Sequence, residues 1–189
     1  MTTYIYMVRH GESPKTEGSE RTRGLMEKGK SDACRITELL TGEGIEVYVS
    51  SPYRRAILTI EESARRSGQE ILQFEELKEQ KFSNEDIRMP DNELMPLLKR
   101  SFSDPSFALP GGETNHECQN RAITVLKQLL TTYQGRRIAV GTHGAVMTLT
   151  MGYYDKRYDL DFLLNTTKPD VYRMEFIGQQ FVGVKRLWI

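Results

Sequence analysis

Short apolar runs alternate along the chain with longer segments whose apolar residues recur every three or four positions. The short runs predict β-strands over residues 3–9, 46–50, 71–74 and 137–141. The helical spacing predicts helices over residues 29–40, 53–66 and 113–133, and another over residues 145–151. Because strands alternate with helices, we expect an α/β fold, a three-layer sandwich around a mostly parallel central sheet.

Two regions depart from this alternation. Residues 171–177 and 181–188 alternate apolar and polar positions around Gly178 and two glutamines, which predicts a hairpin that adds an antiparallel edge strand to the sheet. Residues 80–110 are polar, contain four prolines and show only a short helical pattern near residues 93–100. We predict that residues 1–189 form a single domain, with residues 80–110 as an insertion that caps the active site.

Composition narrows the range of partners. The chain has 26 basic and 26 acidic residues and therefore no net charge, which argues against nucleic acid or an anionic membrane as a partner. No apolar run approaches the roughly 18 residues that span a bilayer, and no signal peptide is recognisable at the N-terminus. We interpret Cys34 and Cys118 as buried free thiols, which suits a reducing cytosol, and we expect a cytoplasmic protein.

The candidate chemistry lies in two His-Gly pairs, each at the end of an apolar strand. His10 and Gly11 follow the first strand, and His143 follows the strand over residues 137–141. In open α/β sheets, ligands bind at the carboxyl ends of the strands. Arg9 disfavours the imidazolium form of His10, because like charges repel, and a neutral imidazole is a nucleophile. We expect Gly11 to let a ligand approach the backbone closely.

A second segment adds positive charge to this edge of the sheet. Residues 50–56 (SSPYRRA) connect a predicted strand to a predicted helix, where Ser51 is expected to cap the helix. A helix N-terminus attracts anions, and arginines there add forked donors that match phosphate oxygens. Singly, each feature has an ordinary explanation, since strand-end histidines and helix-face arginines are common. Their combination favours a phosphate site.

Six segments, in chain order, resemble the motifs of the histidine phosphatase superfamily, also called the phosphoglycerate mutase-like family. They are VRHGES at 8–13, LMEKG at 25–29, SPYRRAILT at 51–59, ELKE at 76–79, PGGET at 110–114 and THG at 142–144. The resemblance extends from residue 4 to about residue 150, and the C-terminal hairpin is similar too. It implies the phosphoglycerate mutase-like fold and places this chain in the compact phosphatase branch.

The resemblance also implies roles for particular residues. His10 attacks phosphorus and becomes phosphohistidine, and Glu79 protonates the leaving alcohol and then activates water. The phosphate-binding set that it implies is Arg9, Arg55, His143 and Gly144. Residues 14–24 lack an asparagine that family members often carry there. Arg21 or Arg23 is expected to supply a phosphate contact instead, the alternative being a flexible charged loop.

We therefore expect a metal-independent phosphatase that needs no cofactor and acts on a small phosphorylated metabolite; an open site would also admit a phosphopeptide. The alternatives are a phosphoglycerate mutase and a catalytically silent module that binds a phosphorylated ligand. His10 and His143 could in principle bind zinc, but the neighbouring arginines oppose a cation and no third ligand at metal spacing is present. The sequence does not indicate the oligomeric state.

Overall fold

A six-stranded sheet forms the centre of the computed structural model, which describes all residues 1–189. Its strands are β1 (Thr2–Arg9), β2 (Val47–Ser50), β3 (Ile71–Gln73), β4 (Arg137–Thr142), β5 (Asp170–Ile177) and β6 (Gln180–Arg186). They are arranged in the order β3-β2-β4-β1-β5-β6, and β1, β2, β3 and β4 pair in parallel. Strand β5 is antiparallel to β1 and to β6, so the predicted mostly parallel sheet with a C-terminal hairpin is confirmed.

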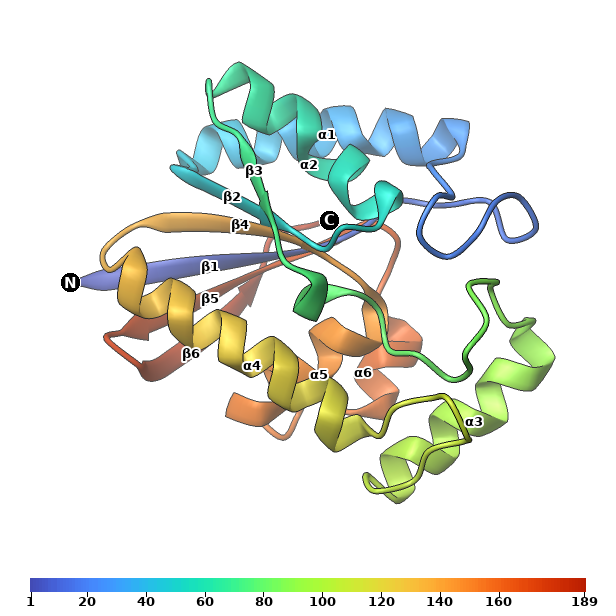
Figure 1. Cartoon of the computed structure of the whole chain (residues 1–189). Helices are drawn as coiled ribbons and strands as arrows, with labels where there is room; N and C mark the ends of the chain where they lie inside the picture. Colours follow the sequence, from blue (N-terminus) through green and yellow to red (C-terminus); the bar gives the residue numbers. More distant parts are fainter.

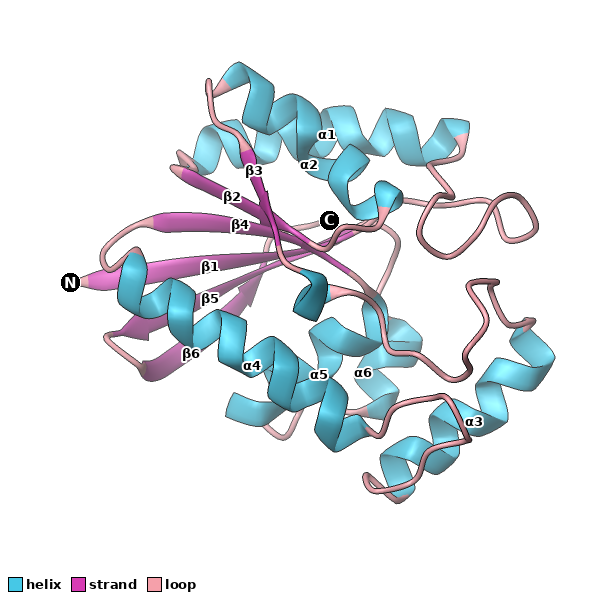
Figure 2. Ribbon diagram, in the orientation of Figure 1, coloured by secondary structure: helices cyan, strands magenta, loops and turns pink.

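Helices cover both faces of this sheet. They are α1 (Glu27–Glu43), α2 (Arg54–Arg66), α3 (Asp91–Ser103), α4 (Asn115–Thr132), α5 (Gly144–Tyr154) and α6 (Leu160–Asn165), with a 3₁₀ turn, η1, over Glu75–Leu77. Figure 1 shows α1 and α2 together on one face and α4 and α5 on the other, while α3 lies beyond the end of the sheet. Figure 2 shows the resulting three layers of helix, sheet and helix.

Strand β1 contributes side chains to the hydrophobic cores on both faces of the sheet. Ile5 and Met7 belong to the core on the α4 side, whereas Tyr6 and Val8 belong to the core on the α1 side. Successive side chains of a strand point to opposite faces, so a central strand needs apolar residues at every position. This is why the first strand of the sequence is a continuous apolar run.

Two expectations about the helices were wrong. Cys34 is exposed, not buried, because the buried residues of α1, such as Ala33 and Ile36, lie on the other side of the helix. Both cysteines are free. Ser51 does not cap α2, which begins at Arg54 with Tyr53 as its N-cap residue.

The remaining differences concern element bounds. The short helix expected near residues 93–100 extends over Asp91–Ser103 and includes Pro96. Helix α6 was not predicted, because its six residues are too few to show a periodic pattern. No helix combines the length and the apolar character needed to cross a membrane.

The carboxyl ends of β1, β2 and β4 meet at one edge of the sheet, and two long segments lie over this edge. One is the loop after β1 over residues 10–26, and the other is the segment over residues 78–110 that contains α3 (Figure 1). The two are joined, because the Glu20 N–H donates to the Asp86 carbonyl at 3.1 Å and Lys15 pairs with Asp91 at 2.6 Å. Together, the two segments cover the edge of the sheet at which the sequence predicts a site.

Candidate active site

A cavity of about 160 Å³ opens at this edge of the sheet and is lined by 22 residues. From the predicted site residues it brings together Arg9, His10, Arg23, Arg55, Glu79 and Gly144. His143 lies directly behind them, with its ring centroid 5.2 Å from that of His10. Residues from five separate segments of the chain therefore meet where the parallel strands end.

His10 is held in one orientation by the strands beneath it. The backbone N–H of His10 donates to the Thr142 carbonyl at 3.1 Å. The ring Nδ1 of His10 lies 2.7 Å from the Gly11 carbonyl oxygen. A carbonyl only accepts hydrogen bonds, so Nδ1 carries the ring proton and Nε2 keeps its lone pair. Arg55 Nε donates to that Nε2 at 3.2 Å.

The environment of His10 keeps its ring neutral. The side chain is almost fully buried, and burial together with the charge of Arg55 holds its pKa well below the usual value of 6.5. Arg9 acts in the same direction. At neutral pH, Nε2 is therefore an unprotonated nitrogen that faces a cationic cavity.

Gly11 serves chain packing and does not make room for a ligand, so that expectation was wrong. A Cβ at position 11 would lie 3.0 Å from the Cα of Gly29, at the start of α1. A Cβ on Gly29 would lie 2.4 Å from the Glu12 carbonyl oxygen. The two glycines let the loop after β1 pack directly on α1, and the Gly11 N–H donates to Thr59 Oγ1 at 3.1 Å. This packing fixes the backbone that carries His10.

Arg9 lies across the N-terminus of α5. Its Nη1 donates to the Thr166 carbonyl at 2.8 Å, and its buried Nε has no partner in the protein. A Cβ at position 144 would lie only 2.7 Å from Arg9 Nη2, so a glycine at 144 is needed to seat this guanidinium. The absence of a side chain at Gly144 therefore leaves the space that the Arg9 guanidinium occupies.

Arg55 and Arg23 share the carboxylate of Glu20. Arg55 Nη2 lies 2.9 Å from one carboxylate oxygen, and Arg23 Nη2 lies 3.1 Å from the other. Burial, followed by the charge of Arg55, lowers the pKa of Arg23 to about 10, so Arg23 stays cationic at neutral pH. Two guanidinium groups that hold two oxygens of one anion form an arrangement that also suits a phosphate group.

The structure separates the two arginines that the sequence left as alternatives. Arg23 is buried and lines the cavity. Arg21 does not line it, because its guanidinium pairs with Glu75 at 2.6 Å on the exposed side of the loop. Of the two, Arg23 is therefore the one placed to contact an anion in the cavity.

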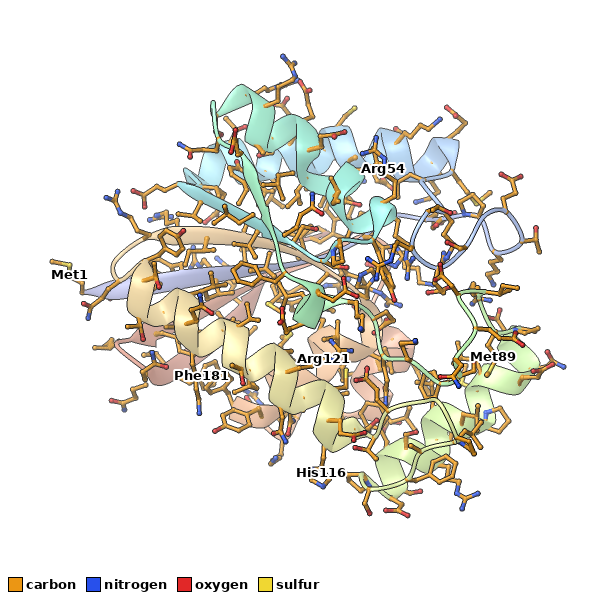
Figure 3. All side chains as sticks on the ribbon, in the orientation of Figure 1. Met1, Arg54, Met89, His116, Arg121 and Phe181 are labelled. Atoms are coloured by element: carbon orange, nitrogen blue, oxygen red, sulfur yellow. The ribbon has the colours of Figure 1, made fainter.

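The Glu79 carboxylate sits at the N-terminus of α5. Its two oxygens accept hydrogen bonds from the N–H groups of Val146 at 2.9 Å and Ala145 at 3.1 Å. Arg121 on α4 holds the backbone of this segment, since it donates to the carbonyls of Lys78 at 2.8 Å and Glu79 at 3.3 Å (Figure 3 labels Arg121). The sequence did not indicate Arg121, because nothing marks an arginine within a long helix as inward-facing.

His143 is the N-cap residue of α5 and is fully buried. Its Nε2 is 2.8 Å from Ser51 Oγ, and its ring packs edge-on against Tyr53 at 5.2 Å between centroids. Burial and the charge of Arg55 hold the pKa of His143 well below 6.5. Its buried Nδ1 has no partner in the protein.

Three cations that the sequence did not indicate also line the cavity. Lys81 and Arg88 come from the capping segment, and Lys168 precedes β5. The sequence analysis looked for site residues only at the carboxyl ends of parallel strands. Strand β5 runs in the opposite direction, so its amino end lies at the same edge of the sheet, with Asp170 opposite Arg9. His116, the third histidine, is exposed at the start of α4 and lies outside the cavity lining (Figure 3).

The cavity is lined by cations, the imidazole of His10, four carboxylates and apolar side chains. No group of three or more His, Cys, Asp or Glu side chains is arranged to hold a metal ion. The fold and the site together define a class of α/β protein whose strand-end histidines and arginines form an anion pocket.

The chain belongs to the histidine phosphatase superfamily (branch 1), whose profile matches residues 5–186. It is 28% identical to phosphoglycerate mutase-like protein 4 of Arabidopsis thaliana, over 97% of this chain and 79% of that protein. The structure of Bacillus stearothermophilus YhfR is similar with a TM-score of 0.80 and 25% identity, covering 95% of this chain and 94% of the other.

A mycobacterial glucosyl-3-phosphoglycerate phosphatase has the same fold. Its TM-score is 0.76 at 16% identity, covering 93% of this chain and 91% of that one. The family match supports an enzyme that acts on phosphate esters.

Substitution of Glu20 by glutamine should tighten the binding of inorganic phosphate by about tenfold. Glutamine keeps an oxygen that accepts from Arg55, but it removes a negative charge next to the site that an anion would take. Calorimetric titration with phosphate measures the change. Glu17→Gln, on the exposed part of the same loop, should leave the affinity unchanged. Weaker binding by Glu20→Gln would contradict the prediction and show that the charge is needed to orient the arginines.

Proposed function

We propose that this protein is a metal-independent phosphatase that hydrolyses small phosphomonoesters through a phosphohistidine on His10. The observation that supports this most directly is the bonding of the His10 ring. Its Nδ1 is committed to the Gly11 carbonyl, so an unprotonated Nε2 faces the cavity beside Arg55. A neutral imidazole nitrogen among cationic donors suits attack on phosphorus.

In the first step, His10 Nε2 forms a bond to phosphorus while the bond from phosphorus to the ester oxygen breaks. Glu79 gives its proton to the departing alcohol. Arg9, Arg55 and His143 stabilise the charge on the phosphoryl oxygens, and Arg23 is placed to join them. Phosphoryl transfer depends mainly on such positioning and positive charge.

In the second step, a water molecule attacks the phosphorus of the phosphohistidine. Glu79, now a carboxylate, takes a proton from that water, the P–N bond breaks, and His10 is restored as phosphate leaves. One carboxyl group thus serves as acid and then as base. The hydrogen bonds from Ala145 and Val146 hold it in one place for both steps.

The capping segment favours hydrolysis over the mutase reaction. A mutase must retain a bisphosphate intermediate, which requires extra cations in a closed site. Here the segment contributes apolar side chains such as Phe82 and Ile87 to the cavity, and its two acidic residues, Glu85 and Asp86, balance its two cations, Lys81 and Arg88. Its Arg88 is already paired with Asp91. Such a wall accommodates an organic group and offers no excess of positive charge for a polyanion, and the small cavity suits a metabolite.

The decisive assay follows p-nitrophenyl phosphate, alkyl phosphates and 3-phosphoglycerate in the presence of EDTA, with and without 2,3-bisphosphoglycerate. We expect release of inorganic phosphate, inhibition by vanadate and no formation of 2-phosphoglycerate. Rapid interconversion of the phosphoglycerates would establish the mutase alternative instead. Loss of activity on chelation, restored by zinc or manganese, would contradict metal independence. Phosphate binding without turnover of any ester would indicate the silent binding module.

A further inference from the structure

Asp170 is a fully buried acidic residue that the mechanism above does not use. It is the first residue of β5 and lies opposite Arg9, the last residue of β1. Its two oxygens accept hydrogen bonds from Arg186 of β6 at 2.9 and 3.0 Å, which makes the pair bidentate. Burial acts to raise the pKa of Asp170, but the hydrogen bonds from Arg186 and from the Thr167 N–H hold it below its usual value. Asp170 is therefore a carboxylate at neutral pH.

The Asp170 carboxylate also holds the turn that precedes β5. One of its oxygens accepts from the Thr167 N–H at 3.0 Å and from the Thr166 hydroxyl at 3.1 Å. The Tyr172 hydroxyl donates to the same oxygen at 2.8 Å. Hydrogen bonds to an ionised acceptor are about twice as strong as those between neutral groups. The backbone at residues 166 and 167 is therefore held firmly against the start of β5.

This turn in turn holds Arg9. The Thr166 carbonyl accepts from Arg9 Nη1 at 2.8 Å, and this is the only hydrogen bond that the Arg9 side chain makes within the protein. Arg9 also makes no ion pair. Burial lowers the pKa of Arg9, whereas the charges of Glu79 and Asp170 act to raise it. Asp170 thus acts on Arg9 in two ways, through the carbonyl that Arg9 contacts and through its own charge.

We propose, on the basis of the phosphatase function above, that Asp170 is a positioning residue, which holds the Thr166 carbonyl in place and thereby orients Arg9 towards the phosphoryl group. Arg186 supplies the opposite charge that a buried carboxylate requires. The hairpin of β5 and β6 therefore contributes to catalysis, although none of its side chains lines the cavity.

The test begins with Asp170→Asn, because asparagine keeps the size of the side chain but has no charge and only one oxygen. The kcat/KM for p-nitrophenyl phosphate should fall by about tenfold, and inorganic phosphate should bind about tenfold more weakly, because a small displacement of a positioning group is costly. Asp155→Asn is the matched control. Asp155 also pairs with an arginine, Arg157, and accepts a backbone N–H, but it lies outside the cavity, so both values should stay unchanged.

A double-mutant cycle with Arg9→Met shows whether Asp170 acts through Arg9. Residues that act through each other have non-additive effects, so Asp170→Asn should cause no further loss of activity or phosphate affinity when Arg9 is absent. A damaged fold, or a displaced Lys168 on the same turn, would lower both values in either background. A tenfold loss that persists in Arg9→Met, or a folded Asp170→Asn variant with wild-type values, would overturn the proposal.

Arg186→Met provides a second variant in case Asp170→Asn does not fold. Arg186 is half-exposed on the edge strand, and its removal takes away two of the bonds that orient Asp170. We expect a smaller loss of phosphate affinity, which again disappears in Arg9→Met. A loss that is the same with and without Arg9 would contradict the proposal.

Phosphate binding, measured by calorimetric titration, separates this proposal from the phosphatase function because it needs no turnover. If the loss of phosphate affinity depends on Arg9 while no ester is hydrolysed, the positioning role stands and the phosphatase function fails. If esters are hydrolysed but the loss does not depend on Arg9, the phosphatase function stands and the positioning role is wrong.

Discussion

Substitution of His10 by alanine should lower the turnover of p-nitrophenyl phosphate by about 10⁴-fold or more, as expected when a covalent nucleophile is removed. The Nε2 of His10 is the unprotonated nitrogen that the Gly11 carbonyl and Arg55 orient towards the cavity. Trapping of the wild-type protein with labelled substrate should yield a phosphoenzyme that is stable in alkali and labile in acid, as phosphoramidates are. The His10→Ala variant should form none.

Two controls keep this result interpretable. His116→Ala changes an exposed histidine outside the cavity and should retain full activity. Circular dichroism and thermal unfolding should show that His10→Ala remains folded, since the strands that carry residue 10 pair through backbone hydrogen bonds. A folded His10→Ala variant with near-normal turnover would rule out the phosphohistidine mechanism.

Substitution of Glu79 by glutamine should reduce the hydrolysis of an alkyl phosphate by about 10²- to 10⁴-fold, the usual contribution of a general acid. The loss for p-nitrophenyl phosphate should be much smaller in the first step, because nitrophenolate leaves without a proton. Glutamine cannot accept from both Ala145 and Val146 as the carboxylate does, so thermal unfolding should be measured beside the rates. Single-turnover formation of the phosphoenzyme isolates the step in question.

The matched control for Glu79→Gln is Glu76→Gln, an exposed carboxylate in η1 outside the cavity, which should leave both rates unchanged. Equal losses for the alkyl and the nitrophenyl ester in Glu79→Gln would show that another group protonates the alcohol. Glu85 and Asp86 would then be the next candidates, because both line the cavity.

Local patterns were sufficient for the fold and for part of the site. The continuous apolar run of β1 and the helical spacing of α4 follow from which faces each element buries, and that information lies within a few consecutive residues. The same holds for Arg9, His10 and His143. Each follows directly on an apolar strand, and parallel strands necessarily bring their carboxyl ends to one edge.

The tertiary structure decided what depends on residues distant in sequence. Gly11 proved to be opposite Gly29, and Arg21 and Arg23, two positions apart, proved to face Glu75 outside the cavity and Glu20 within it. Which side of a loop a side chain takes depends on the partners that the rest of the chain supplies.

The sequence by itself thus determined the α/β sheet and the residues at its parallel strand ends, because hydrophobic periodicity and motif order are local properties. Only the tertiary structure revealed Glu20 between two arginines, and Lys168 in the cavity. Lys168 reaches the site because β5 pairs antiparallel with β1 and therefore brings its amino end to the edge where β1 finishes. The direction of a strand within a sheet is set by long-range pairing, which the residues around position 168 do not encode.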